Sequence, residues 1–386
     1  MKKIKKKKIL FRSGPGMEGG AEKSLLNLLY HLDYSKHQVD VLLRYKSGIY
    51  WKKIPKEVGL YHLVKGKDLF YKTPLTRLVQ KIWSSLTLYV YRIFPYWIYQ
   101  YKLKNTSYDV EIAWLHSFIF DMVKSPLKSK KIVWIHSDFT KVYESKSLMN
   151  KSLHDLQSMD KIVTVSKQAQ DILLSLAPEL EKNTQMVYNI IDADEIIRKA
   201  GSEDVKRQTR LLNLIAIGRL SKEKGFERLI DICHDLKQES IGPFTLSIIG
   251  TGYHSYQSKL SNQIKTLDLE DTVKLLGFKE NPYPYLQAAD IFVLSSHFEG
   301  LPYVVLEALI LNKPIVSTDV VGSRELLKDG ELGLLVDNSE KGLYHGLKRM
   351  IRDESLRNSF IHKKKDFSMF ESKHIARQVE ELINNL

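Results

Sequence analysis

A strand, a glycine turn and a helix bring two carboxylates together over residues 295–309. The apolar run 291–294 predicts a buried strand, and Pro302, at the head of a series of good helix formers, predicts the first turn of a helix. Glu299 lies on the turn between them, and Glu307 lies within the helix. We therefore expect both carboxylates to face one crevice; the simpler alternative is that they only cap and solvate the helix.

The start of this helix also suits an anion. The backbone N–H groups of Gly300, Leu301 and Tyr303 would lie at the positive end of the helix dipole. Carboxylates accept hydrogen bonds from sugar hydroxyls, and helix-terminal amides bind phosphate. The combination indicates a nucleotide sugar as the ligand.

The composition is that of a globular protein with one basic half. The chain has 386 residues, 43% hydrophobic and 27% charged, which predicts two domains. Its net charge of +14 is uneven, because residues 1–200 hold 34 Lys and Arg against 19 Asp and Glu, and residues 201–386 hold 25 against 26. A basic half is compatible with nucleic acid, an anionic membrane surface or an acidic substrate.

Two features predict a cytoplasmic protein. The single cysteine, Cys233, excludes an internal disulfide and fits a reducing compartment. Residues 1–8 carry six lysines, but the apolar segment that follows, 9–11, is far shorter than that of a signal peptide.

The first half opens with a strand, a glycine turn and a helix. Residues 9–12 predict the strand and residues 21–32 the helix, and the turn between them, 14–20, contains the dinucleotide-binding pattern G-x-G-x-x-G. An NAD site would want an acidic residue after the second strand, 39–43, where Arg44 stands instead. The turn is therefore interpreted as one that lets the backbone approach a phosphate or sugar, with hydride transfer as the alternative.

Residues 70–108 contain no acidic residue and alternate basic with aromatic side chains. Their apolar residues recur at helical spacing from Leu75 to Trp97, which predicts an amphipathic helix. Arg92 and Pro95 argue against a membrane-spanning segment, which needs about 20 apolar residues in succession. The helix is expected either to lie in a membrane surface or to pack its apolar stripe on the domain core.

Two further strands, 110–115 and 132–135, each lead to a histidine, His116 and His136. Ligands bind at the carboxyl ends of the strands in open α/β sheets. His136 is therefore a candidate site residue, against the alternative of a structural histidine.

Two polar motifs are interpreted as features of helix starts, the first of them as a cap. Ser166 precedes the expected helix 167–176. Asp192 and Asp194 have a spacing that can hold a divalent metal against a diphosphate, but before an expected helix they more simply add negative charge to its first turn. The polar stretch 201–208 is the expected linker.

Strands and helices alternate beyond the linker. The expected strands are 212–217, 244–249, 273–276, 291–294 and 314–318, and the expected helices are 226–237, 256–267, 285–289 and 302–311. This order predicts a parallel, doubly wound sheet. Because the first half shows the same alternation, the predicted domains are 1–200 and 201–370, with a terminal helix over 371–386 that returns to the first domain.

Several motifs, in this order, resemble the signature set of glycosyltransferase family 4. They are Gly19-Gly20-Ala21-Glu22, Gly218-Arg219 to Lys224-Gly225, Gly250-Thr251-Gly252, Ala289 to Val293, Glu299-Gly300 with Glu307-Ala308, and the run from Val316 to Val336. The likeness covers most of the chain, is densest over 211–337 and is loosest over 45–130. It implies the α/β GT-B fold, in which two Rossmann-like, doubly wound domains face each other across a cleft, and sugar transfer with retention of anomeric configuration.

The resemblance also implies roles for particular residues. Arg219 and Lys224 grip the donor diphosphate, and two fixed cations stabilise the charge of the leaving group with no metal or other cofactor. Glu307 binds the ribose hydroxyls, Glu299 binds the hydroxyls of the transferred sugar, and His136 faces that sugar. Further donor contacts are expected from Gly300, Leu301, Tyr303 and Val304, from the turn Gly19-Gly20, and from the glycines Gly218, Gly252 and Gly277.

The sequence departs from the family pattern at two places. Pro302 stands where many relatives have a second glycine, and Tyr188-Asn189-Ile190 replaces Pro-Asn-Gly. The first change bears on the shape of the sugar pocket. No residue is an evident covalent nucleophile, so retention is expected to proceed by same-face attack, with a donor phosphate oxygen taking the acceptor proton.

The expected protein is a retaining hexosyltransferase of cell-surface polysaccharide biosynthesis. Its donor would be a nucleotide sugar, with a UDP-sugar as the first expectation. Its acceptor would be a saccharide or a polyprenyl-diphosphate-linked saccharide. It would work peripherally at the inner face of the plasma membrane. The alternatives are a non-catalytic GT-B partner subunit of another glycosyltransferase and nucleic-acid binding through the basic half, for which the sequence shows no motif.

Overall fold

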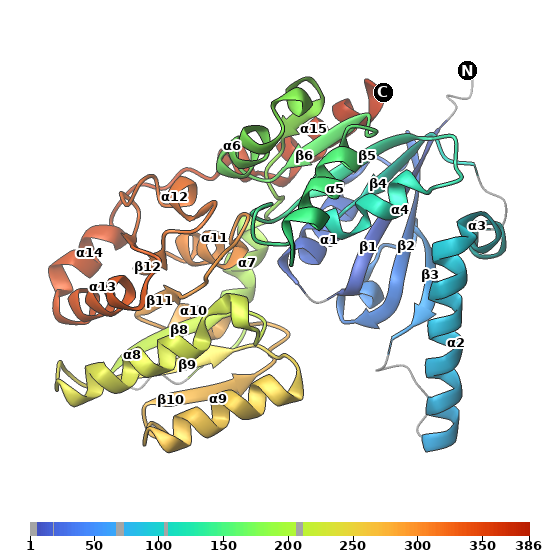
Figure 1. Cartoon of the computed structure of the whole chain (residues 1–386). Coiled ribbons are helices and arrows are strands. Elements are labelled where there is room, and N and C mark those ends of the chain that lie inside the picture. Colours follow the sequence, from blue (N-terminus) through green and yellow to red (C-terminus); the bar gives the residue numbers. More distant parts are fainter. Residues whose placement is uncertain (1–5, 18, 67–72, 104–106, 206–210) are drawn as a thin grey trace. The chain divides into compact units, whose positions relative to one another are not determined.

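The computed structural model describes residues 6–17, 19–66, 73–103, 107–205 and 211–386. The chain forms two compact units, one of Met1–Ile191 with Ser368–Leu386 and the other of Asp192–Phe367 (Figure 1). The predicted domain boundary at residue 200 differs from this division. Residues 192–200 belong to the second unit, because α7 (Ala193–Ala200) packs against α10 (Tyr283–Ala288) and α11 (Tyr303–Ile310) there.

The first unit is built on a seven-stranded parallel sheet with the order β3-β2-β1-β4-β5-β6-β7. Its strands are β1 (Lys7–Met17), β2 (His37–Gly48), β3 (Gly59–Lys65), β4 (Val110–Ala113), β5 (Lys130–Ile135), β6 (Lys161–Thr164) and β7 (Thr184–Met186). The strand β1 runs further than predicted, since Pro15, expected in the turn, pairs with Tyr45 of β2. Most residues of the central strands are buried because helices cover both faces of the sheet, and these residues include the charged Arg12 of β1 and Glu111 of β4.

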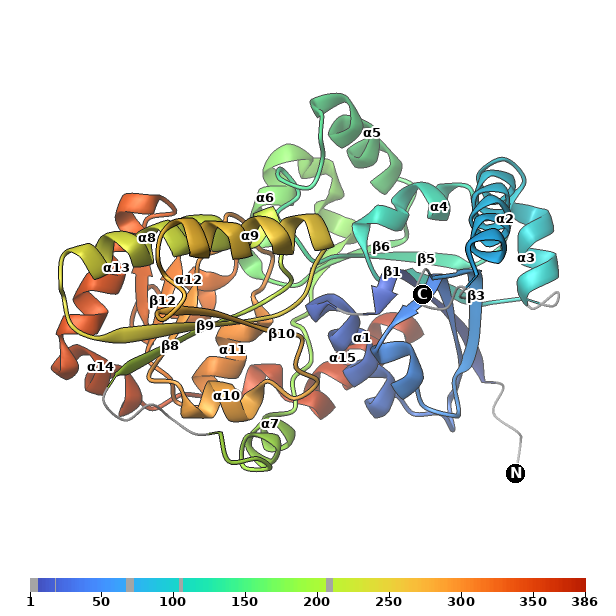
Figure 2. The ribbon, with the colours of Figure 1, turned by 90° about the horizontal axis from the view of Figure 1, so that it is seen from below.

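Figure 2 shows the two helical layers of the first unit. Below the sheet lie α1 (Gly20–His31) and α15 (Ser372–Asn384), and above it lie α4 (Ile119–Val123), α5 (Lys146–Leu156) and α6 (Lys167–Leu176). Because α15 packs against α1, the prediction that the terminal helix returns to the first domain is confirmed. The helices α2 (Pro74–Ile93) and α3 (Pro95–Leu103) contact β3 at the sheet edge.

The second unit is built on a six-stranded parallel sheet with the order β10-β9-β8-β11-β12-β13. Its strands are β8 (Leu212–Ile217), β9 (Phe244–Ile249), β10 (Val273–Gly277), β11 (Ile291–Leu294), β12 (Ile315–Thr318) and β13 (Leu334–Val336). On one face, α8 (Phe226–Gln238), α9 (His254–Thr266) and α13 (Glu340–Arg352) share one apolar core. On the other face lie α10 and α11 (Figure 2). The unit also contains α12 (Ser323–Leu326) and α14 (Glu354–Ile361).

The strand order of the second sheet reverses between β8 and β11. The chain leaves β8 toward β9 and β10 on one side, and then returns with β11 on the other side of β8. The loops that follow β8 and β11 therefore flank the point where the strand order reverses, which is where open α/β sheets bind ligands. Within the described ranges, no helix is both long and apolar enough to cross a bilayer.

Candidate functional site

The loops after β8 and β11 are joined by hydrogen bonds. Ser295 Oγ donates to the carbonyl oxygen of Lys224 at 2.8 Å. The backbone N–H of His297 donates to the carbonyl oxygen of Glu223 at 2.7 Å. The two loops thus form one surface at the carboxyl end of the second sheet.

Lys224 and Glu299 meet on this surface. Lys224 Nζ lies 2.6 Å from Glu299 Oε1, and Ser296 Oγ donates to the same oxygen at 2.7 Å. The Lys224 side chain is 21% exposed and that of Glu299 is 13% exposed. Among the described residues, none donates a hydrogen bond to Glu299 Oε2. The site thus holds a half-buried ion pair with one carboxylate oxygen available to a ligand.

Arg219 lies on the same loop but is not part of this pair. Its guanidinium is 66% exposed and lies 2.9 Å from Glu223 Oε1. Burial raises the pKa of Glu223, but hydrogen bonds from Ser221 and the backbone, with the charge of Arg219, outweigh burial and lower that pKa. Of the two cations predicted to grip the donor diphosphate, Lys224 pairs with Glu299 and Arg219 pairs with Glu223.

Glu307 occupies a separate, buried position. It is 4% exposed on α11, and Tyr283 of α10 donates its hydroxyl hydrogen to Glu307 Oε1 at 3.0 Å. The helix begins at Tyr303, with Pro302 at the N-cap rather than in the first turn as predicted. Since Glu307 lies in the middle of α11, it neither caps the helix nor is solvated, and the simpler alternative is wrong for it.

The predicted glycines hold the loops close together. A Cβ atom on Gly252 would lie 2.0 Å from the carbonyl oxygen of Leu220, so only glycine lets the turn after β9 pass the loop after β8. Gly218 lies under the Lys224 side chain, whose Cδ would be 3.4 Å from an added Cβ. Gly277, at the end of β10, has a φ of +69°, and no atom lies within 4 Å of an added Cβ. Of the remaining predicted contacts, Leu301 and Tyr303 are buried, Gly300 is buried and Val304 is half-buried.

A buried arginine that sequence reasoning missed positions the loop after β11. Arg228 donates to the carbonyl oxygens of Ser295, at 2.7 and 3.0 Å, and Ser296, at 2.8 Å. It also donates to Asn338 Oδ1 at 2.8 Å, and Asn338 Nδ2 donates to the carbonyl oxygen of His297 at 2.7 Å. The only signal in the sequence was a basic residue among apolar ones in the first turn of α8.

The candidate residues of the first unit lie at the carboxyl edge of its sheet. Gly19 is the N-cap of α1 and Gly20 is its first residue, directly after β1. His136 follows β5, with its ring 5.3 Å from that of Trp114. Burial and the neighbouring His116 lower the pKa of His136 to about 3, so the imidazole is neutral at pH 7. Its Nε2 is buried with no hydrogen-bond partner among the described residues, which is unusual for a polar atom.

The predicted helix cap at Ser166 is confirmed, and Asp192 caps a second helix. Ser166 Oγ accepts a hydrogen bond from the N–H of Ala169 at 3.1 Å, and α6 spans Lys167–Leu176 as predicted. Asp192 Oδ1 accepts from the N–H of Glu195 at 2.8 Å at the start of α7. Asp192 therefore has a structural role, and independence of metals stays a prediction.

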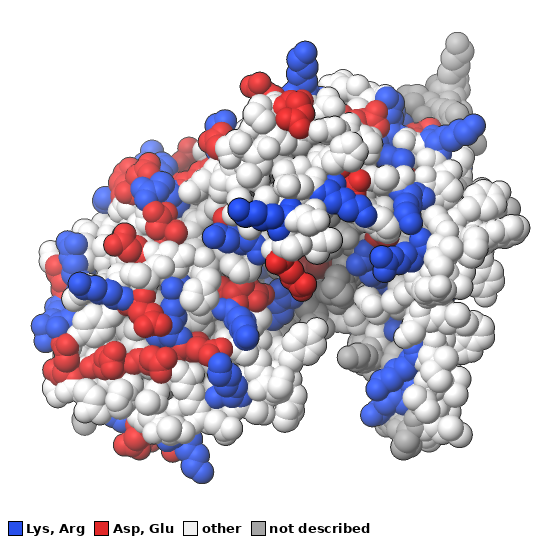
Figure 3. All heavy atoms as spheres, in the orientation of Figure 1, with Lys and Arg blue, Asp and Glu red and all other residues white. Residues whose placement is uncertain are grey.

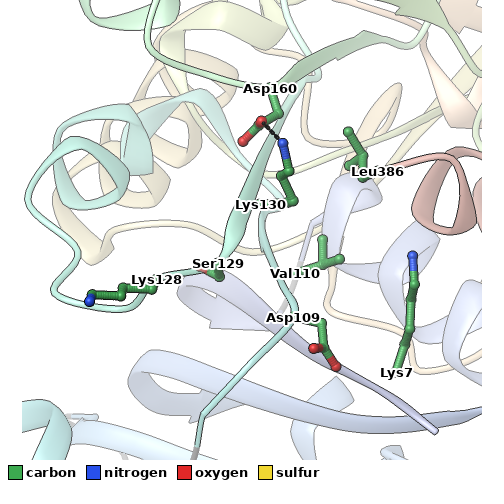
Figure 4. Close-up of a pocket in the computed structure, with 8 residues that line it drawn as sticks. All are labelled: Lys7, Asp109, Val110, Lys128, Ser129, Lys130, Asp160 and Leu386. Atoms are coloured by element: carbon green, nitrogen blue, oxygen red, sulfur yellow. Dashed lines mark hydrogen bonds and ion pairs between the residues drawn. The ribbon is translucent and has the colours of Figure 1, made fainter. Parts of the chain in front are cut away.

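A polar pocket of about 540 Å³ lies elsewhere in the first unit (Figure 4). Lys7, Val110 and Lys130 line it at the amino ends of β1, β4 and β5, whereas His136 follows the carboxyl end of β5. Lys130 pairs with Asp160 at 2.8 Å, and Lys7 donates to backbone carbonyls at the end of α15. Lys7 and Lys130 are thus bonded within the protein, and none of the predicted site residues lines the pocket.

Comparison with known proteins adds an independent line of evidence. Residues 198–367 match the family described as glycosyl transferases group 1. The N-acetylgalactosamine-N,N'-diacetylbacillosaminyl-diphospho-undecaprenol 4-alpha-N-acetylgalactosaminyltransferase of Campylobacter jejuni is 36% identical over 236 residues, which are 60% of this chain and 62% of that protein. The amylovoran biosynthesis glycosyltransferase AmsK of Erwinia amylovora is 36% identical over 137 residues, 33% of each chain.

The fold is shared over nearly the whole chain. The crystal structure of Anabaena HepE in complex with UDP and glucose superposes with a TM-score of 0.73 at 20% identity, and the match covers 98% of this chain and 100% of that one. With the two parallel sheets, this likeness confirms the predicted α/β, GT-B fold class. Residues 198–367, which make up most of the second unit, are thus similar to the glycosyl transferases group 1.

Proposed function

We propose that this protein is a retaining glycosyltransferase that moves a hexose from a UDP-sugar to a saccharide or polyprenyl-diphosphate-linked acceptor. Its product would enter a cell-surface glycan. The observation that carries the proposal is the Lys224–Glu299 pair at the carboxyl edge of the second sheet. The UDP bound to HepE and the diphospho-undecaprenol in the name of the Campylobacter protein support the choice of donor and acceptor.

The cations of the loop after β8 would bind the donor diphosphate. Lys224 is already held in place by Glu299, so it needs little rearrangement to meet a phosphate. Arg219 is held only by an exposed pair with Glu223, and such pairs contribute little, so Arg219 can turn toward a ligand. Two cations would offset the charge of the leaving diphosphate without a metal.

The carboxylates would bind hydroxyl groups at the two ends of the donor. Glu299 Oε2 would accept from the transferred sugar, since its Oε1 is already used by Lys224 and Ser296. Glu307, oriented by Tyr283, would accept from the ribose. The backbone of Gly300, Leu301, Tyr303 and Val304, and the glycines at 218, 252 and 277, would complete the donor contacts.

The first unit would supply the acceptor side of the reaction. The unpartnered, buried Nε2 of His136 supports a hydrogen bond from this neutral ring to the sugar, and the Gly19-Gly20 turn would approach the diphosphate. In the transfer itself, the bond from the anomeric carbon to the phosphate oxygen breaks, and the acceptor oxygen bonds to that carbon from the same face. The acceptor proton passes to the departing phosphate oxygen. A lipid-linked acceptor would place this reaction at the inner face of the plasma membrane.

The test is a transfer assay with matched variants. Purified protein is incubated with labelled UDP-, GDP- and dTDP-sugars and a membrane extract. Lys224→Met and Glu299→Gln should each lower kcat about 100-fold, because each removes a group that stabilises developing charge or orients the sugar. The controls are Lys222→Met, from the same turn with an exposed side chain, and Glu331→Gln, also exposed.

Three outcomes would count against the proposal. The wild type might transfer no sugar, or the control variants might lose as much activity as Lys224→Met. Donor binding, seen as a thermal shift, without turnover until a second polypeptide is added would favour the non-catalytic partner subunit instead. A glycosyl adduct trapped on Glu299 would replace same-face attack by a covalent mechanism.

A further inference from the structure

The helix α2 of the first unit carries its apolar stripe on its outward side. The stripe runs at helical spacing, and its members are exposed from 45% at Ile93 to 73% at Leu75. The residues of the stripe are Leu75, Leu78, Val79, Ile82, Trp83, Leu86, Tyr89 and Ile93. The stripe continues onto Phe94, Tyr96 and Trp97 at the start of α3.

The side of α2 that packs on the protein mixes polar and apolar residues. Gln80, Ser84, Thr87 and Tyr91, at i, i+4, i+7 and i+11, are half-buried or buried, and so are Leu88 and Val90. At 100° per residue Gln80, Ser84, Thr87 and Tyr91 lie opposite the stripe. A surface helix of a globular protein normally turns its apolar stripe inward. The alternative that this stripe packs on the domain core is therefore wrong.

A buried polar cluster fixes α2 in this orientation. Arg12 of β1 donates to Tyr91 Oη at 3.1 Å, and its guanidinium lies 4.7 Å from the ring centre of Tyr99 in α3. Arg12 also pairs with the buried Glu111 of β4. Rotating α2 to bury its stripe would take Tyr91 away from Arg12, and this buried guanidinium would lose a hydrogen-bond acceptor.

Cations lie beside the stripe. Arg92, Lys124 and Lys151 surround the ring of Phe120, at 6.0, 4.5 and 4.9 Å from its centre. None of the three has a salt-bridge partner among the described residues. Along α2, the face seen in Figure 3 shows neutral and basic side chains and no acidic ones.

We propose that the outward stripe of α2, with Phe94, Tyr96 and Trp97, docks on an anionic lipid surface; we call it the α2 face. A contiguous row of large exposed apolar side chains marks an interaction site. Tryptophan and tyrosine favour the membrane interface, and basic residues beside them attract anionic headgroups. A second copy of the chain fits less well, because a two-fold dimer through this face would bring the same cations together. The inference does not depend on the proposed transfer reaction.

Sedimentation with lipid vesicles tests the α2 face without donor or acceptor. The wild type should bind vesicles of phosphatidylglycerol and phosphatidylcholine. Ile82→Glu should bind at least about tenfold more weakly, because it removes a large apolar side chain from the buried face and adds a negative charge. The control is Leu148→Glu, which places the same charge on α5 at a residue that is 50% exposed. Both positions are exposed, so circular dichroism and melting temperature should match the wild type.

A second variant tests the role of charge. Replacing Arg92, Lys124 and Lys151 by glutamine should reduce binding to anionic vesicles to the level seen with phosphatidylcholine alone. The proposal is overturned if the wild type binds neither vesicle, or if Leu148→Glu loses as much binding as Ile82→Glu. It is also overturned if light scattering shows a lipid-independent dimer that Ile82→Glu dissociates. Because vesicle binding requires no sugar, its failure is distinguishable from a failure of the proposed function.

Discussion

Lys224 and Glu299 depend on each other at the residue scale. Each is mostly shielded from water, and each compensates the charge of the other at 2.6 Å. Removing one partner of such a pair leaves an uncompensated charge, whereas a neutral isostere keeps the hydrogen bonds. Glu299→Gln is thus the more informative variant, since it retains an acceptor for Lys224 and Ser296 while it removes the charge.

Two histidines of the first unit predict a pH dependence of stability. Burial lowers the pKa of His136 to about 3, with a contribution from His116, and lowers the pKa of His116 to about 4. The ordinary value is 6.5. Below pH 6.5 the unfolded chain therefore binds protons that the folded unit does not bind. The free energy of unfolding should fall from pH 6.5 to about pH 4, by up to about 1.4 kcal/mol per pH unit for each histidine.

Urea denaturation of the first unit at several pH values measures this slope. His136→Asn should flatten it, because the variant no longer has that proton to bind on unfolding. His362→Asn, at an exposed position at the end of α14, is the control. Equal slopes for the wild type and His136→Asn would show that burial does not keep this imidazole neutral.

At the scale of elements, one side chain holds the loop after β11 in place. Arg228 projects from the first turn of α8 and bonds two successive carbonyls, and Asn338, after β13, links it to a third. Gly225 is part of the same arrangement: its φ is +64°, and an added Cβ would lie 2.1 Å from the carbonyl oxygen of Ser295. Arg228, Asn338 and Gly225 thus together determine the position of the loop that carries Glu299.

Arg228→Met should destabilise the second unit by about 2–3 kcal/mol, because buried carbonyls lose a charged donor. It should also weaken binding of the donor nucleotide, since the loop that carries Glu299 would shift. Denaturation and UDP titration measure the two effects. The matched control is Arg349→Met on α13, where the arginine is exposed. Destabilisation with unchanged UDP affinity would limit Arg228 to a role in stability.

At the scale of the whole molecule, the chain ends in the unit where it began. The helix α15 belongs to the first unit and buries Ile375, Val379 and Ile383, although the second unit lies between it and residue 191 in the sequence. The first unit is therefore complete only when the whole chain has been made. The two units need not unfold together.

Val379→Asp should lower the stability of the first unit by more than about 3 kcal/mol and leave that of the second unchanged, because it buries a carboxylate between α15 and the rest of its unit. Hydrogen exchange followed by mass spectrometry resolves the two units. Arg377→Asp, exposed on the same helix, is the control. Faster exchange in Asp192–Phe367 would contradict the assignment of α15 to the first unit alone.

The sequence by itself determined the two doubly wound sheets and the helix caps. Largely apolar runs predicted β8, β9 and β11 at the residues where they occur, since a strand covered on both faces is mostly apolar. The short edge strands β3 and β7 were not predicted, because few of their residues are buried. The local sequence pattern was sufficient to predict a strand or a helix cap wherever the residues that form it lie close together in the chain.

Only the tertiary structure decided how distant residues meet. It placed β11 beside β8 and so joined Lys224 to Glu299, and it paired Arg219 with Glu223 instead. It also decided that α2 packs by the side that carries Tyr91 and leaves its apolar stripe exposed. Helical periodicity shows that a helix has two different sides, but which side faces the protein depends on contacts such as that between Arg12 and Tyr91, whose residues lie far apart in the sequence.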